Sequence, residues 1–165
     1  MRLHLMRHGI AIDRTDPACP PEADRFLTPR GVAKTEAAAR GLRAIGIKPG
    51  VILTSPLLRA VQTAEIVCEV LGYSVKKLRQ TEALKPETKA ASLFEEISAL
   101  KADEVLCVGH APNLDLVIAL GVGCHSTVTA LKKAGCASLD IESFSPPRGS
   151  IVSVYVPRTL RLLAD

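Results

Sequence analysis

The chain has 165 residues, of which 47% are hydrophobic and 23% charged, a length and composition typical of one soluble globular domain spanning residues 1–165. Aromatic residues make up only 3% of it, tryptophan is absent, and the lysines and arginines behind the net charge of +4 are dispersed, so a nucleic-acid surface built on base stacking is not expected. No apolar run approaches the roughly 20 residues of a membrane span, and charged residues and histidines interrupt the first apolar run, which argues against a secretory signal peptide.

In chain order, the sequence predicts alternating strands and helices. The segments are a strand over 2–6, a helix over 29–45, a strand over 51–55, a helix over 56–71, a weaker strand over 73–79, a helix over 87–101, a strand over 104–110, a helix over 113–121 and two strands over 135–144 and 149–157. Thr28 and Ser55, each followed by proline, are typical helix N-caps, while Gly46 and Gly72 are typical helix ends. The residues from 13 to 31 are rich in proline and charge and predict a loop.

The order of these segments predicts the sheet. Short apolar strands that alternate with helices through residue 121 favour a parallel sheet with helices on both faces. The last two strands are joined by residues 145–149, a link too short for a crossover, so we expect them to pair antiparallel. Ligands of open parallel sheets bind beyond the carboxyl ends of the strands, so the residues at those ends are the candidates for a functional site.

Three of the predicted strand ends carry cationic or imidazole side chains. Arg7 and His8 follow the first strand, and His110 follows the strand that begins at residue 104. Arg59 would be the fourth residue of a helix that begins at Pro56. Taken singly, each has an ordinary explanation, such as a strand exit, a surface helix residue or a capping histidine. Because the carboxyl ends of parallel strands meet at one edge, we expect the four side chains to converge on an anion site.

The chemistry of this set suits phosphoryl transfer. Arginine offers a planar fork of donors that matches two phosphate oxygens. Two nearby cations disfavour the imidazolium form, which keeps a histidine neutral and nucleophilic. Gly9, after His8, lets the backbone approach a ligand without a side chain. By contrast, we expect His4 to be a core histidine with satisfied hydrogen bonds, and His125 to be a loop residue.

The five cysteines indicate a reducing environment. Their number is odd and no pair has the CxxC spacing of a metal or redox motif, while Cys68 and Cys107 lie in apolar runs. We expect buried, reduced thiols, which favours a cytoplasmic localisation.

Four segments resemble the histidine phosphatase superfamily, also called the phosphoglycerate mutase-like superfamily. They are LMRHG (5–9), LTPRG (27–31), SPLLRAVQTAE (55–65) and VGHAPNL (108–114), in family order along nearly the whole chain. The short length, the absence of a cap insertion and the segment EALKP (82–86) look most like the SixA branch, the phosphohistidine phosphatases.

The resemblance implies a three-layer α/β/α sandwich and assigns roles to the four converging residues. His8 would be the nucleophile that becomes phosphorylated, Arg7 and Arg59 would clamp the phosphoryl group with Gly9 giving it room, and His110 would donate to its oxygens. No metal or organic cofactor is implied, and the sequence has no metal-ligand spacing. The implied partner is a phosphohistidine-containing protein or a small phosphorylated substrate, without nucleic acid or membrane.

One departure from the family pattern concerns the leaving group. Phosphomonoesterases and mutases of the superfamily carry a general acid after the third strand, where this chain has Leu84-Lys85-Pro86. Proline cannot protonate an alkoxide, and a general acid contributes about 10²–10⁴-fold. The imidazole of phosphohistidine can instead be protonated on its free nitrogen and leave neutral. We therefore expect a phosphohistidine phosphatase.

Two alternatives stay open from the sequence. The flanking Glu82 and Glu87 are either solvated loop charges or displaced general acids, and the second case would make the protein a phosphomonoesterase of the same superfamily acting on a small molecule or phosphoprotein. A non-catalytic phosphate-binding module is the alternative of another class, although a module that only binds needs no nucleophile.

Overall fold

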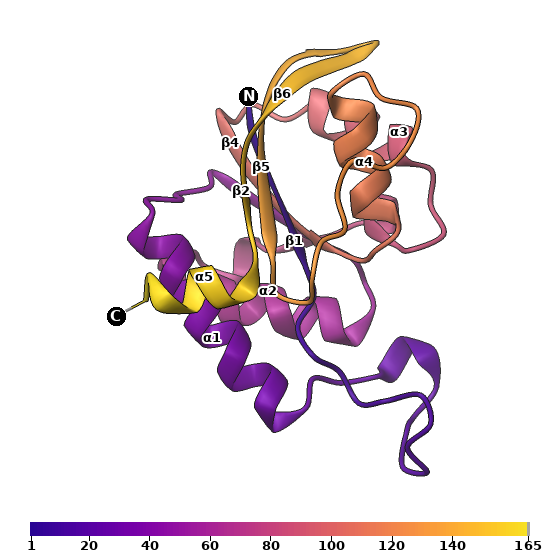
Figure 1. Ribbon diagram of the computed structural model, residues 1–165, viewed down its shortest axis with the longest axis vertical. Helices are drawn as coiled ribbons and strands as arrows, with labels where there is room; N and C mark the ends of the chain where they lie inside the picture. Colours follow the sequence, from indigo (N-terminus) through magenta and orange to yellow (C-terminus); the bar gives the residue numbers. More distant parts are fainter. Residues whose placement is uncertain (165) are drawn as a thin grey trace.

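The computed structural model describes residues 1–164, in which a central sheet is covered by helices on both faces (Figure 1). The elements are β1 (Arg2–Arg7), α1 (Pro29–Ala44), β2 (Val51–Thr54), α2 (Leu58–Leu71), β3 (Arg79–Gln80), α3 (Ala90–Ser98), β4 (Glu104–Gly109), α4 (Asn113–Gly121), β5 (Cys136–Phe144), β6 (Pro147–Tyr155) and α5 (Pro157–Leu162). Short 3₁₀ turns lie at Glu22–Asp24, Val75–Lys77 and Glu82–Leu84.

The sheet is mostly parallel and has the strand order β3-β2-β4-β1-β5-β6. Strands β1 to β4 run parallel, β5 pairs antiparallel with β1, and β6 pairs antiparallel with β5, which confirms the predicted C-terminal hairpin. Arg7 lies opposite Gly109 in the β1–β4 ladder, and Thr54 lies opposite Val108 in the β2–β4 ladder. This register sets His8, Ser55 and His110 side by side where the three strands end.

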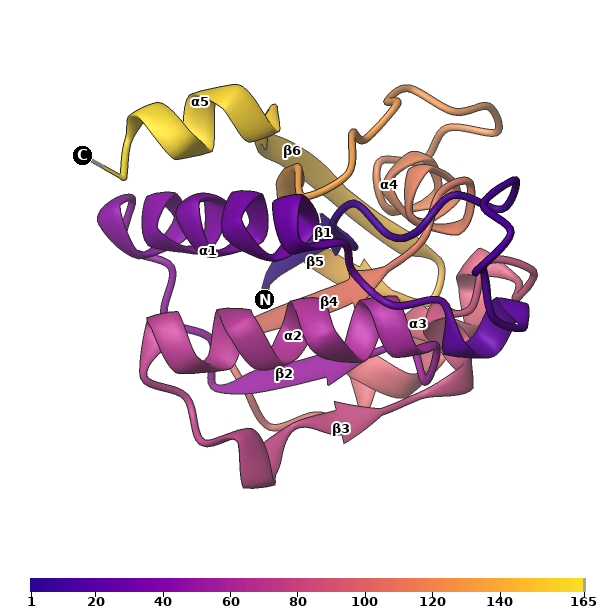
Figure 2. The ribbon, with the colours of Figure 1, turned by 90° about the horizontal axis from the view of Figure 1, so that it is seen from below.

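Two apolar layers hold the helices on the sheet, as the three-layer prediction requires. One layer packs Leu3 and Leu5 of β1 against α3 and α4 around the fully buried Phe94. The other packs Met6 of β1 against α1, α2 and α5, which lie together on the second face (Figure 2). Alternate residues of a strand point to opposite faces, so one short strand supplies both layers. Among the described helices, none combines the length and hydrophobicity of a membrane-spanning segment.

Three local predictions were wrong. Helix α2 begins at Leu58 rather than residue 56, and Ser55 does not cap it. The predicted strand over 73–79 is reduced to Arg79–Gln80, because Tyr73 and Leu78 are held by packing against the α2 layer rather than by a strand ladder.

Helix α5 was not predicted, because its six residues are too few to show a helical period. Its Leu160 is fully buried, and the backbone of Leu160 lies so close to Gly41 of α1 that a side chain there would collide with it.

Candidate active site

A cavity of about 310 Å³ opens where β1, β2 and β4 end. The residues that line it are Arg7, His8, Asp13, Arg14, Arg25, Arg59, Pro86, His110, Ala111 and Lys133. The structure therefore brings together all four side chains predicted to converge. Five of the lining residues are arginine or lysine and one is an aspartate, so the cavity is strongly electropositive and suits an anion.

His8 stands at the end of β1 in a defined tautomer. Its Nδ1 lies 2.7 Å from the carbonyl oxygen of Gly9, which can only accept, so Nδ1 carries the proton and Nε2 carries the lone pair. The side chain is buried, and this burial, helped by the charges of Arg59 and Arg7, lowers the pKa of His8 to about 3. At neutral pH His8 is thus a neutral imidazole with its Nε2 free to attack.

His110 lies beside it, with the two ring centroids 4.9 Å apart. Its Nε2 is 2.9 Å from the hydroxyl oxygen of Ser55, which accepts the backbone N–H of Leu57 at 3.3 Å. This favours donation of the Ser55 proton to Nε2 and places the His110 proton on Nδ1. Within the described residues that Nδ1 is buried without a partner, and burial with the neighbouring His8 lowers the pKa of His110 to about 3.

The two predicted clamp residues, Arg59 and Arg7, are each held by hydrogen bonds from the terminal nitrogens of the guanidinium group. Arg59 lies in the first turn of α2, as its second residue rather than the predicted fourth. Its two terminal nitrogens donate to the backbone oxygen and the carboxylate of Glu22, at 2.9 and 2.8 Å. Arg7 donates from one terminal nitrogen to the carbonyl of Leu131 at 2.8 Å. The Nε of both arginines is buried and finds no acceptor among residues 1–164.

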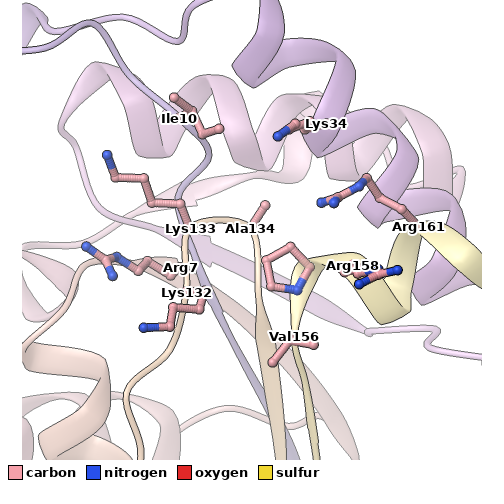
Figure 3. Close-up of a pocket in the computed structure, with 10 residues that line it drawn as sticks. Arg7, Ile10, Lys34, Lys132, Lys133, Ala134, Val156, Arg158 and Arg161 are labelled. Atoms are coloured by element: carbon pink, nitrogen blue, oxygen red, sulfur yellow. The ribbon is translucent and has the colours of Figure 1, made fainter.

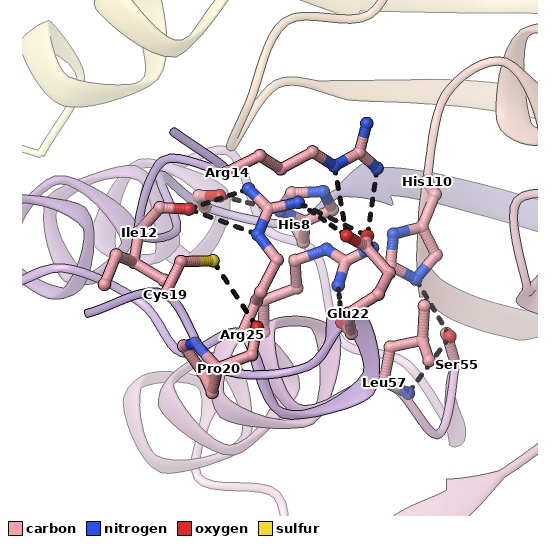
Figure 4. A network of polar contacts seen from close by, with 12 residues as sticks. His8, Ile12, Arg14, Cys19, Pro20, Glu22, Arg25, Ser55, Leu57 and His110 are labelled. Carbon is pink, nitrogen blue, oxygen red and sulfur yellow. Dashed lines mark hydrogen bonds and ion pairs between the residues drawn. The ribbon is translucent and has the colours of Figure 1, made fainter. Parts of the chain in front are cut away.

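A network in the loop after β1 was missed by sequence reasoning. Glu22 accepts hydrogen bonds from Arg14, Arg25 and Arg59, and Arg25 also donates to the carbonyl of Ile12 at 2.7 Å (Figure 4). These bonds, above all those from Arg14, hold the pKa of Glu22 at about 2. The only signal in the sequence was the density of opposite charges between residues 13 and 25, which does not reveal which of them turn toward a cavity.

Gly9 has a structural role that the sequence did not predict. It is not among the lining residues, and a side chain on it would collide with the hydroxyl oxygen of Thr35 in α1. Its N–H donates to Thr63 of α2 at 3.0 Å, and its carbonyl holds the His8 tautomer. Glycine is needed here because α1 packs so closely on this backbone that a side chain would have no space.

The carboxyl groups nearest the cavity are ionised at neutral pH. Asp13 lines the cavity, and hydrogen bonds from Thr15 lower its pKa, while Glu22 has the low pKa given above. Pro86 forms part of the wall. Glu82 and Glu87 are exposed outside the wall, and Glu82 pairs with Lys85 at 2.6 Å. No protonated acid therefore faces the cavity from this part of the chain.

Among residues 1–164, no three His, Cys, Asp or Glu side chains gather as a group that could hold a metal ion. Three residues at the cavity keep a buried nitrogen without a hydrogen-bond partner among residues 1–164: Arg7 and Arg59 at Nε, and His110 at Nδ1. Such donors match the oxygens of a phosphoryl group.

Comparison with known proteins points the same way. A model of the histidine phosphatase superfamily (branch 1) matches residues 3–86, which include Arg7, His8 and Arg59. An uncharacterised protein of Picosynechococcus sp. is 37% identical over 144 residues, or 84% of each chain. The structure of the protein histidine phosphatase SixA complexed with tungstate matches with a TM-score of 0.85 and 25% identity, covering 97% of this chain and 99% of that one.

A second type of relative is also present. A 2,3-bisphosphoglycerate-dependent phosphoglycerate mutase of Methylobacterium radiotolerans is 37% identical over 81 residues, which are 49% of this chain and 36% of the mutase. This chain thus spans about a third of the mutase, and the shared part leaves most of that protein unmatched.

Proposed function

Because this chain belongs to the histidine phosphatase superfamily and is a phosphatase, we propose that it hydrolyses the P–N bond of phosphohistidine in a protein, with His8 as the residue that is transiently phosphorylated. The partner would be a phosphorylated protein in the cytoplasm. Five cysteines that form no disulfide, three of them buried, support that compartment.

In the first step, the lone pair of His8 Nε2 attacks the phosphorus atom. A bond forms between Nε2 and phosphorus, and the bond between phosphorus and the substrate imidazole breaks. Arg7, Arg59 and the Nδ1–H of His110 would hold the equatorial oxygens, whose charge must be stabilised as the phosphoryl group transfers. In the second step, a water oxygen bonds to the phosphorus of phospho-His8, the bond between Nε2 and phosphorus breaks, and phosphate leaves as the water gives up a proton to the solvent. The lone pair returns to Nε2, so His8 regains its neutral form.

A single observation carries the choice of substrate: no protonated acid faces the cavity from the described residues. Asp13 and Glu22 have lowered pKa values, and Pro86 stands in the wall. An alkoxide leaving group needs a proton donor, which contributes about 10²–10⁴-fold. The imidazole of phosphohistidine takes its proton from solvent on the free ring nitrogen and departs neutral. The cavity therefore supports cleavage of a P–N bond better than cleavage of an alkyl ester.

The test compares two peptides of one sequence, one phosphorylated on histidine and the other with phosphoserine in its place. We expect kcat/KM for the phosphohistidine peptide to exceed that for the phosphoserine peptide by at least about 10²–10⁴-fold. Glu82→Gln and Glu87→Gln serve as controls and should leave phosphohistidine turnover unchanged.

Comparable kcat/KM values for the two peptides would contradict the phosphohistidine proposal. The partial likeness to a phosphoglycerate mutase keeps a phosphomonoesterase as the second candidate. Loss of ester hydrolysis in Glu82→Gln alone would identify a displaced acid and favour that candidate.

A further inference from the structure

A second cavity of about 510 Å³ adjoins the proposed catalytic cavity (Figure 3). The two share Arg7 and Lys133 in their walls, so they lie next to each other. The second cavity is lined by Arg7, Ile10, Lys34, Lys132, Lys133, Ala134, Val156, Pro157, Arg158 and Arg161. These residues come from the end of β1 and the loop after it, from α1, from the loop before β5, and from α5 with the residue that precedes it.

Six of the ten lining residues are arginine or lysine, and none is acidic. Within residues 1–164, none of the six forms an ion pair with a carboxylate. The charge of Arg30 and burial lower the pKa of Lys34, while burial and the charge of Arg7 lower that of Lys133. Cations that lie close together without carboxylate partners repel one another, and an anion that binds among them relieves this repulsion.

The remaining lining residues, Ile10, Ala134, Val156 and Pro157, are apolar, and Val156 is half exposed. Figure 3 shows Lys132, Lys133 and Arg7 on one side of this apolar surface and Lys34, Arg158 and Arg161 on the other. One compact anion would reach only a few of these cations. Several carboxylates spaced along a peptide, with their aliphatic stems on the apolar surface, match the arrangement in both charge and polarity.

We propose that this second cavity docks an acidic segment, rich in aspartate and glutamate, of the same protein whose phosphohistidine enters the catalytic cavity. The inference rests on the proposed function, because it assigns the substrate's second point of contact. It makes the enzyme selective for phosphohistidines that lie near acidic residues.

The experiment uses two phosphohistidine peptides of equal length, one with aspartate and glutamate on both sides of the phosphohistidine and the other with asparagine and glutamine instead. The variant is Lys34→Gln/Arg158→Gln/Arg161→Gln, which touches only the second cavity. The matched control is Lys76→Gln/Lys77→Gln/Arg79→Gln, which removes three exposed charges at the opposite edge of the sheet, near β3. Free phosphoramidate serves as a substrate too small to reach both cavities.

We expect the variant to lose roughly tenfold in kcat/KM on the acidic peptide, through KM, since exposed ion pairs of this kind are individually weak. The neutral peptide, phosphoramidate and the control variant should show wild-type values. On the wild-type enzyme, added salt should weaken turnover of the acidic peptide more steeply than that of the neutral one, a readout that needs no variant.

If the variant lost kcat/KM equally on both peptides, the inference would be overturned, because such a loss would reflect a general change in the electrostatic field at the catalytic cavity. Equal turnover of both peptides by wild type and variant, with equal salt dependence, would overturn docking and leave the proposed function standing. Failure of the wild-type enzyme to hydrolyse either peptide, while it hydrolyses phosphate esters, would remove the proposed function and the docking inference with it.

Discussion

Acidification should destabilise this protein through its two active-site histidines. Burial lowers the pKa of His8 to about 3 in the folded chain, against an ordinary value of 6.5. Between these values the unfolded chain binds a proton that the folded chain does not, so the folded state loses stability as the pH falls from 6.5 toward 3. Between pH 7.5 and pH 5, His8 alone should lower the free energy of unfolding by about 2 kcal/mol. His110, shifted in the same direction for the same first cause, should add a similar loss.

The assay is urea unfolding at pH 7.5 and at pH 5, on the wild type and on His8→Gln. His8 and His110 together should cost the wild type about 4 kcal/mol of unfolding free energy over this interval, and the variant should lose about 2 kcal/mol less than the wild type. Burial also lowers the pKa of His4, which adds the same loss to both proteins and leaves their difference unchanged. Glu22 does not interfere, because its pKa is lowered, and its stabilising effect is lost only as the pH falls below about 4.5. His125→Gln, which replaces an exposed loop histidine, is the matched control. Its free energy of unfolding should fall between pH 7.5 and pH 5 by as much as that of the wild type.

An equal loss in wild type and His8→Gln would refute the reasoning. It would mean that His8 takes up a proton in the folded state as readily as in the unfolded chain. The neutral, nucleophilic form that the proposed mechanism needs would then not be the form present near pH 6.

Three further predictions concern individual residues. His8→Ala should abolish turnover and leave the fold intact, and an acid-labile, base-stable phosphoryl adduct should form on the wild type only; more than a few per cent residual activity would contradict a covalent step at His8. Arg59→Lys keeps the charge but loses the fork, so kcat/KM should fall about 10²-fold, and a near wild-type value would remove Arg59 from the clamp. Gly9→Ala should cost about 1–3 kcal/mol in unfolding free energy through its collision with Thr35, and Thr35→Ala should restore part of it; no rescue would show that the collision is not the cause.

Much of the fold follows from local patterns in the sequence. Thr28 caps α1 by accepting from the N–H of Gly31 at 3.0 Å, and α4 occupies the predicted residues 113–121. The failures fall where the local pattern is short or ambiguous. The pair Ser55-Pro56 reads as a helix start, but the Ser55 hydroxyl instead contacts His110, which is 55 residues away in the chain.

The sequence by itself determined most of the strands and helices and the four residues at the carboxyl edge, because apolar periodicity and the rule for parallel sheets act on neighbouring residues and on strand ends. Only the tertiary structure decided the tautomer of His8, the closeness of Gly9 to Thr35 and the contact of Glu22 with Arg59. It also placed the cations of α1 and α5 around one cavity. These features depend on distances between segments far apart in the chain, and burial among those segments, rather than any local motif, sets the pKa values that the chemistry uses.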